Sequence, residues 1–271
     1  MKKRALSALL CLALCFALAG QAAAAEGGVS FTVNGTPLAE DVRSYAEDGT
    51  TYVSYGAILF ALYPDATAVW ANGRAEVAAE GLTMYLKPGA KYIEANGRCL
   101  YVPGGVRSED GVIRVPVRTL CQALGAEAVW DSATGTVNIT AVSGPIVSGD
   151  SYYDAEDLDL LSRLIYAESG NQPLEGKIAV GNVVLNRVAS PLFPNTVADV
   201  IYQPNQFAPA GSGHLSRTPN AESVVAAKLC LDGANTAGNA LYFVNPVTSP
   251  GSWASRNRPY VATIGAHAFY A

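Results

Sequence analysis

The side chain best suited to chemistry in this 271-residue sequence is the carboxyl group of Glu168. It lies in "LIYAESGNQP", residues 164–173, at the end of an apolar stretch with helical periodicity. Leu161, Leu164 and Ile165 precede it at helical spacing, so Glu168 projects from the same apolar stripe. Burial on such a stripe disfavours the charged form of a carboxyl group, and a carboxyl that stays protonated near neutral pH suits general acid catalysis. The alternative is a frayed helix end at which Glu168 reaches water.

Two helices must position this carboxyl. The first is predicted to begin at Asp154, a residue type that caps helix N-termini, and to end at Gly170. The second, "LEGKIAVGNVVLNRV", is apolar nearly all round and is predicted as a buried central helix. Asn182 and Asn186 lie four positions apart on it, and buried amides need partners. We expect one of them to face the groove or hold a loop, with an interior hydrogen bond as the alternative for each.

Short elements are predicted around this pair of helices. "QPNQF" is a turn-rich loop that presents Gln206 and Phe207. A further helix is closed by Gly233, and "NALYFVNP" and "YVATIGAHAFY" have the alternation of short strands.

Metal and thiol chemistry have weaker support in the sequence. His214 and His267 lie far apart without ligand spacing, whereas a zinc-dependent amidase would need about three protein ligands. Cys230 is expected inside a helix among apolar residues, which is not the open, electropositive setting that activates a nucleophilic thiol. We therefore expect no metal and no other cofactor. Cys99 and Cys121 lie in one segment, and whether they form a disulfide is left open.

A second catalytic carboxyl is not evident. Asp199 and Asp232 are expected on helix surfaces, and Glu175 and Glu222 are expected in first helical turns, where acids suit the helix dipole. Most glycosidases use two carboxyl groups, so a single acid would favour a mechanism that needs only one.

The first half of the chain resembles itself. Residues 30–79 and 92–141 match at an offset of about 62, with "DGTTYV" aligned on "DGVIRV" and Trp70 on Trp130. Asn-Gly and Asp-Gly pairs are typical of hairpin turns because they tolerate positive φ. Each copy is predicted as strands, one helix and further strands. The expected fold is an α+β domain built from two strand–helix–strand repeats of about 62 residues.

Residues 1–25 have the features of a signal peptide: a positive start, an apolar run and small residues before a cleavage site near Ala25 and Glu26. An uncleaved signal anchor is the alternative. The formal net charge of −5 becomes −8 without Lys2, Lys3 and Arg4, which argues against a nucleic-acid-binding protein. We expect an exported two-domain protein in which residues 142–153, rich in Gly, Ser and Pro, form a linker.

The repeats, through "VNGTPL", "DGVIRVPVRTLCQALGAEAVWD" and "GTVNIT", resemble the copper amine oxidase N-terminal-like domain of secreted and wall-associated proteins. The segment 26–141 contains no histidine, so a copper site is not expected. The resemblance implies either a module that attaches the protein to the cell wall or a structural spacer, since fold resemblance alone says little about function.

The second half, 154–271, resembles the cell wall hydrolase family typified by the spore cortex-lytic enzymes. The resemblance lies in "YAESGNQPLEGKIAVGNVVLNRV", "FPNTVADVIYQPNQF", "ALYFVNP" and "RPYVATIGAHAFY". It implies a mainly helical, lysozyme-like catalytic domain that cleaves the glycan strands of peptidoglycan, with Glu168 as the catalytic acid and Ser169 supporting it. Many members have a second acid shortly after the first, where this chain has Asn171 and Gln172.

A lytic transglycosylase follows from these expectations, with peptidoglycan as partner and the cell wall or spore envelope as location. Gln206, Phe207, Tyr242 and Asn245 are predicted to bind the sugars, with a core or turn role as the alternative for each. A hydrolytic muramidase, an amidase and a non-catalytic wall-binding protein are the alternative functions. Spore cortex and vegetative wall are both left open as substrates.

Overall fold

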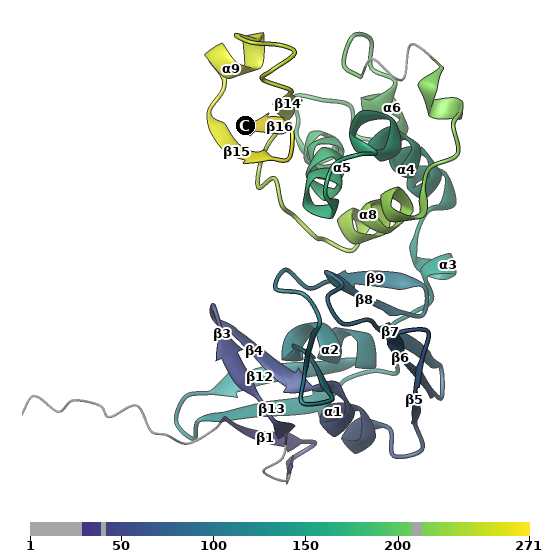
Figure 1. The fold of residues 1–271 in the computed structure, drawn as a ribbon, viewed down its shortest axis with the longest axis vertical. Coiled ribbons are helices and arrows are strands. Elements are labelled where there is room, and N and C mark those ends of the chain that lie inside the picture. Colours follow the sequence, from purple (N-terminus) through teal and green to yellow (C-terminus); the bar gives the residue numbers. More distant parts are fainter. Residues whose placement is uncertain (1–28, 39–41, 208–212) are drawn as a thin grey trace, which may run out of the picture.

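The structure is a computed structural model that describes residues 29–38, 42–207 and 213–271 (Figure 1). The expected signal peptide lies outside these residues. Buried apolar side chains form one cluster between Phe31 and Ile146 and a second between Leu161 and Phe269, which Cys99 also joins. No helix in the described ranges is long and apolar enough to cross a bilayer.

The first half contains three sheets and two helices in its described residues. Its sheets have the strand orders β12-β13-β1-β2, β10-β11-β4-β3 and β5-β6-β7-β8-β9. The elements in chain order are β1 (Ser30–Val33), β2 (Thr36–Pro37), β3 (Tyr45–Glu47), β4 (Thr50–Ser54), α1 (Tyr55–Leu62), β5 (Thr67–Ala71), β6 (Arg74–Ala79), β7 (Leu82–Leu86), β8 (Tyr92–Ala95), β9 (Arg98–Tyr101), β10 (Arg107–Glu109), β11 (Val112–Pro116), α2 (Val117–Leu124), β12 (Ala126–Asp131) and β13 (Thr136–Ala141).

Two runs of these elements have the same order, β3-β4-α1-β5-β6 and β10-β11-α2-β12-β13. They meet at β4 and β11, which pair antiparallel with Val53 opposite Val115. The hairpin turns follow local chemistry: Asp48 and Asp110 each have positive φ before a glycine that also has positive φ. Gly125 ends α2 in the left-handed conformation, and a Cβ there would lie 1.9 Å from the carbonyl oxygen of Gly144.

The second half consists of helices and a small sheet with the order β14-β16-β15 (Figure 1). Its central helix α5 buries Ile178, Val180, Val183 and Val184 completely between its neighbours. The elements are α3 (Gly149–Tyr152), α4 (Ala155–Ser169), α5 (Leu174–Ala189), α6 (Val197–Ile201), the 3-10 helix η2 (His214–Ser216), α8 (Ala221–Leu231), β14 (Tyr242–Val244), α9 (Trp253–Asn257), β15 (Tyr260–Ile264) and β16 (His267–Tyr270).

Both asparagines of α5 hold the loop that precedes β14. The side-chain amide of Asn182 donates to the carbonyl oxygen of Ala234 at 2.7 Å, and its oxygen accepts from the N–H of Thr236 at 2.9 Å. Asn186 donates to the carbonyl oxygens of Gly238 and Ala240, each at 2.9 Å. These bonds fix the loop to the central helix, so the small sheet starts from a defined position.

The segment expected as a linker, 142–153, packs against the first half. Ile146 is buried in the first cluster, and its N–H donates to the carbonyl oxygen of Ala123 at 3.1 Å. The hydroxyl of Ser148 caps α3 by accepting from the N–H of Asp150. The connection between the two halves is therefore ordered along its length.

A buried polar cluster joins β9 to the end of α8, which face each other in Figure 1. The guanidinium Nε of Arg98 donates to Oδ1 of Asp232 at 2.9 Å, and the hydroxyl of Tyr153 donates to the other carboxylate oxygen. The ammonium group of Lys228 donates to the carbonyl oxygen of Gly97 at 2.7 Å. The expectation that Asp232 is a surface acid is wrong: its side chain is 1% exposed because the first half covers it.

Candidate active site

Glu168 lies in the last turn of α4, and the helix that carries it is fixed at both ends. Asp154 caps its start by accepting from the N–H groups of Glu156 and Asp157, each at 2.9 Å. Leu161 and Ile165, on the stripe that also carries Glu168, are completely buried. Glu168 itself is half-buried, so the predicted position on an apolar stripe agrees with the structure.

The Glu168 carboxyl has no polar partner among the described residues. No described residue forms a hydrogen bond or an ion pair with this carboxyl. Burial is the cause that raises its pKa, to about 7. About half of such groups hold a proton at neutral pH. The carboxyl is therefore able to donate a proton and then, as a carboxylate, to accept one.

Ser169 is completely buried directly after Glu168, and its hydroxyl donates to the carbonyl oxygen of Ile165 at 2.8 Å. The hydrogen of this hydroxyl is thus used within the helix, so Ser169 supports the last turn of α4 rather than donating to the acid. This bond is local, and a serine near a helix end commonly makes it.

The chain directly after α4 is held against the small sheet. The side-chain oxygen of Gln172 accepts from the N–H of Ala266 in the β15–β16 turn at 2.8 Å. Gly170 allows the close turn, because a Cβ there would lie 2.6 Å from the carbonyl oxygen of Tyr166. Gln172, one of the residues that differs from the acidic family pattern, therefore helps to fix the segment around Glu168.

A second group of side chains surrounds Tyr242 on β14. Its ring lies edge-on to Phe193 and Trp253, with ring centres 6.1 and 5.6 Å apart respectively. The guanidinium carbons of Arg187 and Arg258 lie 5.5 and 5.1 Å from the centre of the Tyr242 ring. This group brings the C-terminal turn of α5 against the small sheet.

Arg187 is a buried member of this group, and the sequence predicts no role for it. Its Nε donates to the carbonyl oxygen of Leu241 at 2.8 Å, and burial lowers the pKa of its guanidinium to about 10. From sequence alone, a single arginine in an apolar helix that packs in a buried aromatic group cannot be told from one that extends into solvent.

The predicted sugar-binding residues occupy different environments. Tyr242 is half-buried in the aromatic group, and Gln206 is exposed in a turn. The side-chain oxygen of Asn245 accepts from the N–H of Val247 at 2.9 Å, which organises its own loop. The prediction for Phe207 is wrong: it is 5% exposed and packs in the second core cluster, 6.4 Å from the ring of Phe243, so it presents no face to a substrate.

The other carboxyl groups considered in the second half have partners. Glu222 pairs with the buried ammonium group of Lys177, and Glu175 lies 3.0 Å from that of Lys91. Asp199 accepts from the hydroxyl of Thr196 at 2.8 Å. Glu168 thus differs from all of these acids in having no polar partner among the residues that the structure describes.

The histidine and cysteine side chains of the described residues show no sign of a metal site or an activated thiol. In the part of the chain that the structure describes, no three His, Cys, Asp or Glu side chains form a group able to hold a metal. The imidazole of His267 is mostly buried, and burial lowers its pKa. Cys99, Cys121 and Cys230 are free thiols, and burial raises the pKa of each. Cys99 and Cys121 belong to different core clusters and do not form a disulfide with each other.

Comparisons with known proteins match the two halves separately. A family model described as Cell Wall Hydrolase matches residues 171–270, and one described as Copper amine oxidase N-terminal domain matches residues 32–139. The spore cortex-lytic enzyme of Bacillus cereus is 39% identical over 117 residues, which are 43% of this chain and 45% of that protein. The cell wall hydrolase CwlJ of Oceanobacillus iheyensis is 32% identical over 127 residues, which are 44% of this chain and 89% of that protein.

A solved structure is also similar in sequence. The catalytic domain of the germination-specific lytic transglycosylase SleB from Bacillus anthracis is 38% identical, with a TM-score of 0.42. The match covers 44% of this chain and 97% of that domain. The chain spans less than half the length of the spore cortex-lytic enzymes that it matches.

Proposed function

Because the chain belongs to the cell wall hydrolase family, we propose that it cleaves the glycan strands of peptidoglycan with Glu168 as its catalytic acid. The observation that carries this proposal is the half-buried Glu168 carboxyl, which has no polar partner in the described residues and a pKa of about 7. The names of the relatives, spore cortex-lytic enzyme and lytic transglycosylase, support the choice of polymer.

We propose a lytic transglycosylase mechanism, because one carboxyl group suffices for it. The Glu168 carboxyl donates its proton to the glycosidic oxygen between N-acetylmuramic acid and N-acetylglucosamine, and that C–O bond breaks. The resulting carboxylate accepts the proton of the muramic acid C6 hydroxyl, whose oxygen bonds to C1 and closes a 1,6-anhydro ring. The proton given up in the first step is recovered in the second, and water is not consumed.

Ser169 is a positioning residue in this proposal. Its hydroxyl bonds the last turn of α4 internally, which keeps the Glu168 side chain on the stripe where it is desolvated. Tyr242, Gln206 and Asn245 are proposed substrate contacts. Tyr242 is favoured among them because its half-buried ring lies beside the exposed indole of Trp253.

We further propose that residues 1–25 direct export and that the mature chain begins near Glu26. The functional division would be a wall-attaching domain at 26–141, a connection at 142–153 and a catalytic domain at 154–271. The ordered connection and the Arg98–Asp232 pair support a fixed arrangement of the two. The action would take place in the cell wall or the spore envelope.

Mass spectrometry of the soluble products tests this function. Purified protein and its Glu168→Gln variant would be incubated with peptidoglycan sacculi and, in parallel, with spore cortex. Products ending in 1,6-anhydromuramic acid, made only by the unaltered protein, are expected. Reducing-end muramic acid would identify a hydrolytic muramidase, and free stem peptides would identify an amidase. Equal products from both proteins would contradict the role of Glu168.

A further inference from the structure

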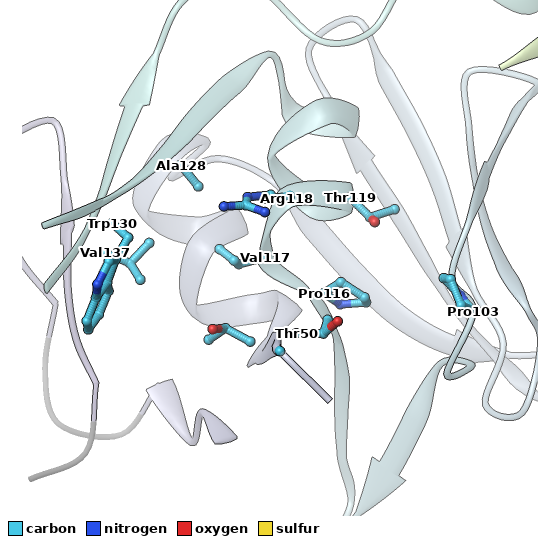
Figure 2. Close-up of a pocket in the computed structure, with 11 residues that line it drawn as sticks. Thr50, Pro103, Pro116, Val117, Arg118, Thr119, Ala128, Trp130 and Val137 are labelled. Atoms are coloured by element: carbon cyan, nitrogen blue, oxygen red, sulfur yellow. The ribbon is translucent and has the colours of Figure 1, made fainter. Parts of the chain in front are cut away.

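Two hollows of similar construction lie on the first half of the molecule. One, here called the Trp130 hollow, has a volume of about 410 Å³ (Figure 2) and is lined by Thr50, Thr51, Pro116, Arg118, Thr119 and Trp130 among others. The second, the Trp70 hollow, has a volume of about 500 Å³ and is lined by Ser54, Tyr55, Gly56, Trp70, Gly111 and Ile113 among others.

The two hollows are built from corresponding residues of the two runs of elements. Each combines the start of a β-strand from one run with the helix start and following strand pair of the other. Thr51 at the start of β4 corresponds to Ile113 in β11, and Ser54 before α1 corresponds to Pro116 before α2. This exchange arises because β4 and β11 pair with each other at the centre of the domain. The domain therefore contains two hollows of the same construction. The first run of elements supplies the strand start to one, and the second run supplies it to the other.

Each hollow contains one tryptophan that is far from buried. The side chain of Trp70 is 62% exposed and that of Trp130 is 51% exposed, although a large indole ring is usually placed in a core or an interface. They occupy corresponding positions in β5 and β12, and both strands are largely exposed. An indole face beside a hollow suits a flat ligand with an apolar face and a polar edge, as a pyranose ring has.

We propose that the Trp70 and Trp130 hollows are two glycan-binding sites, each of which stacks one sugar ring of a peptidoglycan strand on its indole. The choice of ligand rests on the proposed function, because the second half of the same chain would act on that polymer. Hydroxyl groups of Thr50 and Thr119 in one hollow and Ser54 in the other would bond the polar edge of the sugar.

The two sites differ in charge, which predicts a difference in ligand. Arg118 lines the Trp130 hollow together with the indole (Figure 2), and the corresponding position in the Trp70 hollow is Gly56. No ion pair or hydrogen bond from a described residue engages the guanidinium of Arg118, and it is exposed in a protein of net charge −5. A carboxylate on the bound strand, such as that of a muramic acid that carries no stem peptide, would complement it. The Trp130 hollow is therefore the one that selects an acidic sugar.

Indole NMR signals test this proposal directly, since the chain has three tryptophans, Trp70, Trp130 and Trp253. The full protein carrying Glu168→Gln, with ¹⁵N-labelled indoles, would be titrated with peptide-free strands of alternating N-acetylglucosamine and N-acetylmuramic acid. This background keeps the strands intact. The signals of Trp70 and Trp130 are expected to shift on binding, and shifts confined to Trp253 would overturn the proposal.

Variants sharpen the assignment. Trp70→Ala and Trp130→Ala are each expected to weaken binding about threefold to tenfold, which is the scale of one aromatic contact. Tyr202→Ala removes an exposed aromatic ring from the second half and serves as the matched control, with binding unchanged. Arg118→Gly makes the Trp130 hollow resemble the other one, so the Trp130 shift should weaken and lose its dependence on salt. Equal binding by all of these variants would overturn the proposal.

The two proposals fail in different ways. A protein that cuts strands but shows no response at Trp70 and Trp130 would retain the proposed function and lose these sites. A protein whose Trp70 and Trp130 bind strands, but which releases no products, would be a wall-binding protein without the proposed activity.

Discussion

The ends of α4 and α8 each place a carboxyl group where water has little access, and the two groups have opposite surroundings. Asp232 after α8 accepts hydrogen bonds from Arg98 and Tyr153. Glu168 in the last turn of α4 has no such partner in the described structure, and its pKa rises to about 7. A buried carboxyl whose oxygens accept hydrogen bonds from two distant elements joins those parts of a protein. One without partners retains its proton, so it is available for proton transfer.

The largest expected effect is on catalysis at Glu168. Glu168→Gln retains the shape of the side chain but removes the transferable proton, so strand cleavage should fall about 1000-fold, equivalent to about 4 kcal/mol of barrier. Release of soluble muropeptides over time measures this. Glu156→Gln makes the same substitution at an exposed position on the same helix and should leave the rate unchanged. Equal rates for all three proteins would remove Glu168 from the mechanism.

Asp232→Asn is expected to affect stability instead. It leaves the guanidinium of Arg98 buried without an opposite charge, which should cost about 3 kcal/mol of unfolding free energy. Urea denaturation measures the loss. Asp159→Asn breaks the exposed ion pair with Arg163 and should change stability by less than about 0.5 kcal/mol. If both variants had the same small effect, the junction between the halves would not depend on the buried pair.

Stability should also depend on pH through Glu168. Its pKa is raised in the folded state, so the folded protein holds this proton between about pH 4.5 and 7, whereas the unfolded chain has released it. The favourable contribution is complete below pH 4.5 and is lost as the pH rises through about 7. From pH 4 to pH 8, Glu168→Gln should therefore gain about 3 kcal/mol of unfolding free energy relative to the unaltered protein. Urea titrations at both pH values measure this difference, and a constant difference would contradict the raised pKa.

The smallest effect is expected at Ser169. Its hydroxyl donates to a carbonyl of its own helix, so Ser169→Ala should change stability by less than about 1 kcal/mol and leave most of the cleavage rate. Ser162→Ala is a matched control, because the buried Ser162 makes the same type of bond to the carbonyl oxygen of Leu158. A large loss of cleavage in the Ser169 variant alone would mean that its hydroxyl acts on the acid directly.

Features set by neighbouring residues could be predicted from the sequence. The Asp154 cap, the apolar stripe that leads to Glu168 and the left-handed Gly125 depend on a few adjacent positions. The Asp-Gly turns depend on two residues each, and both have positive φ as expected. Local spacing carries this information because helices and tight turns are built from short-range contacts.

Features that depend on distant parts of the chain could not be predicted. Asp232 meets Arg98 across 134 positions, and nothing near either residue indicates the other. Phe207 follows a turn-rich segment, yet long-range packing draws its ring into the core beside Phe243. The exposed indoles of Trp70 and Trp130 were matched as repeat positions, but only the folded domain shows the hollows beside them.

Titration of the Glu168 carboxyl by ¹³C NMR measures directly the raised pKa on which the proposed proton transfer depends. The glutamate side-chain carboxyl carbons would be labelled, and the Glu168 signal would be identified by its absence in Glu168→Gln. We expect a midpoint of about 7, because burial raises the pKa of this carboxyl and no described partner opposes the shift. A midpoint near the ordinary value of about 4.3 would show a solvated carboxylate and contradict its role as general acid.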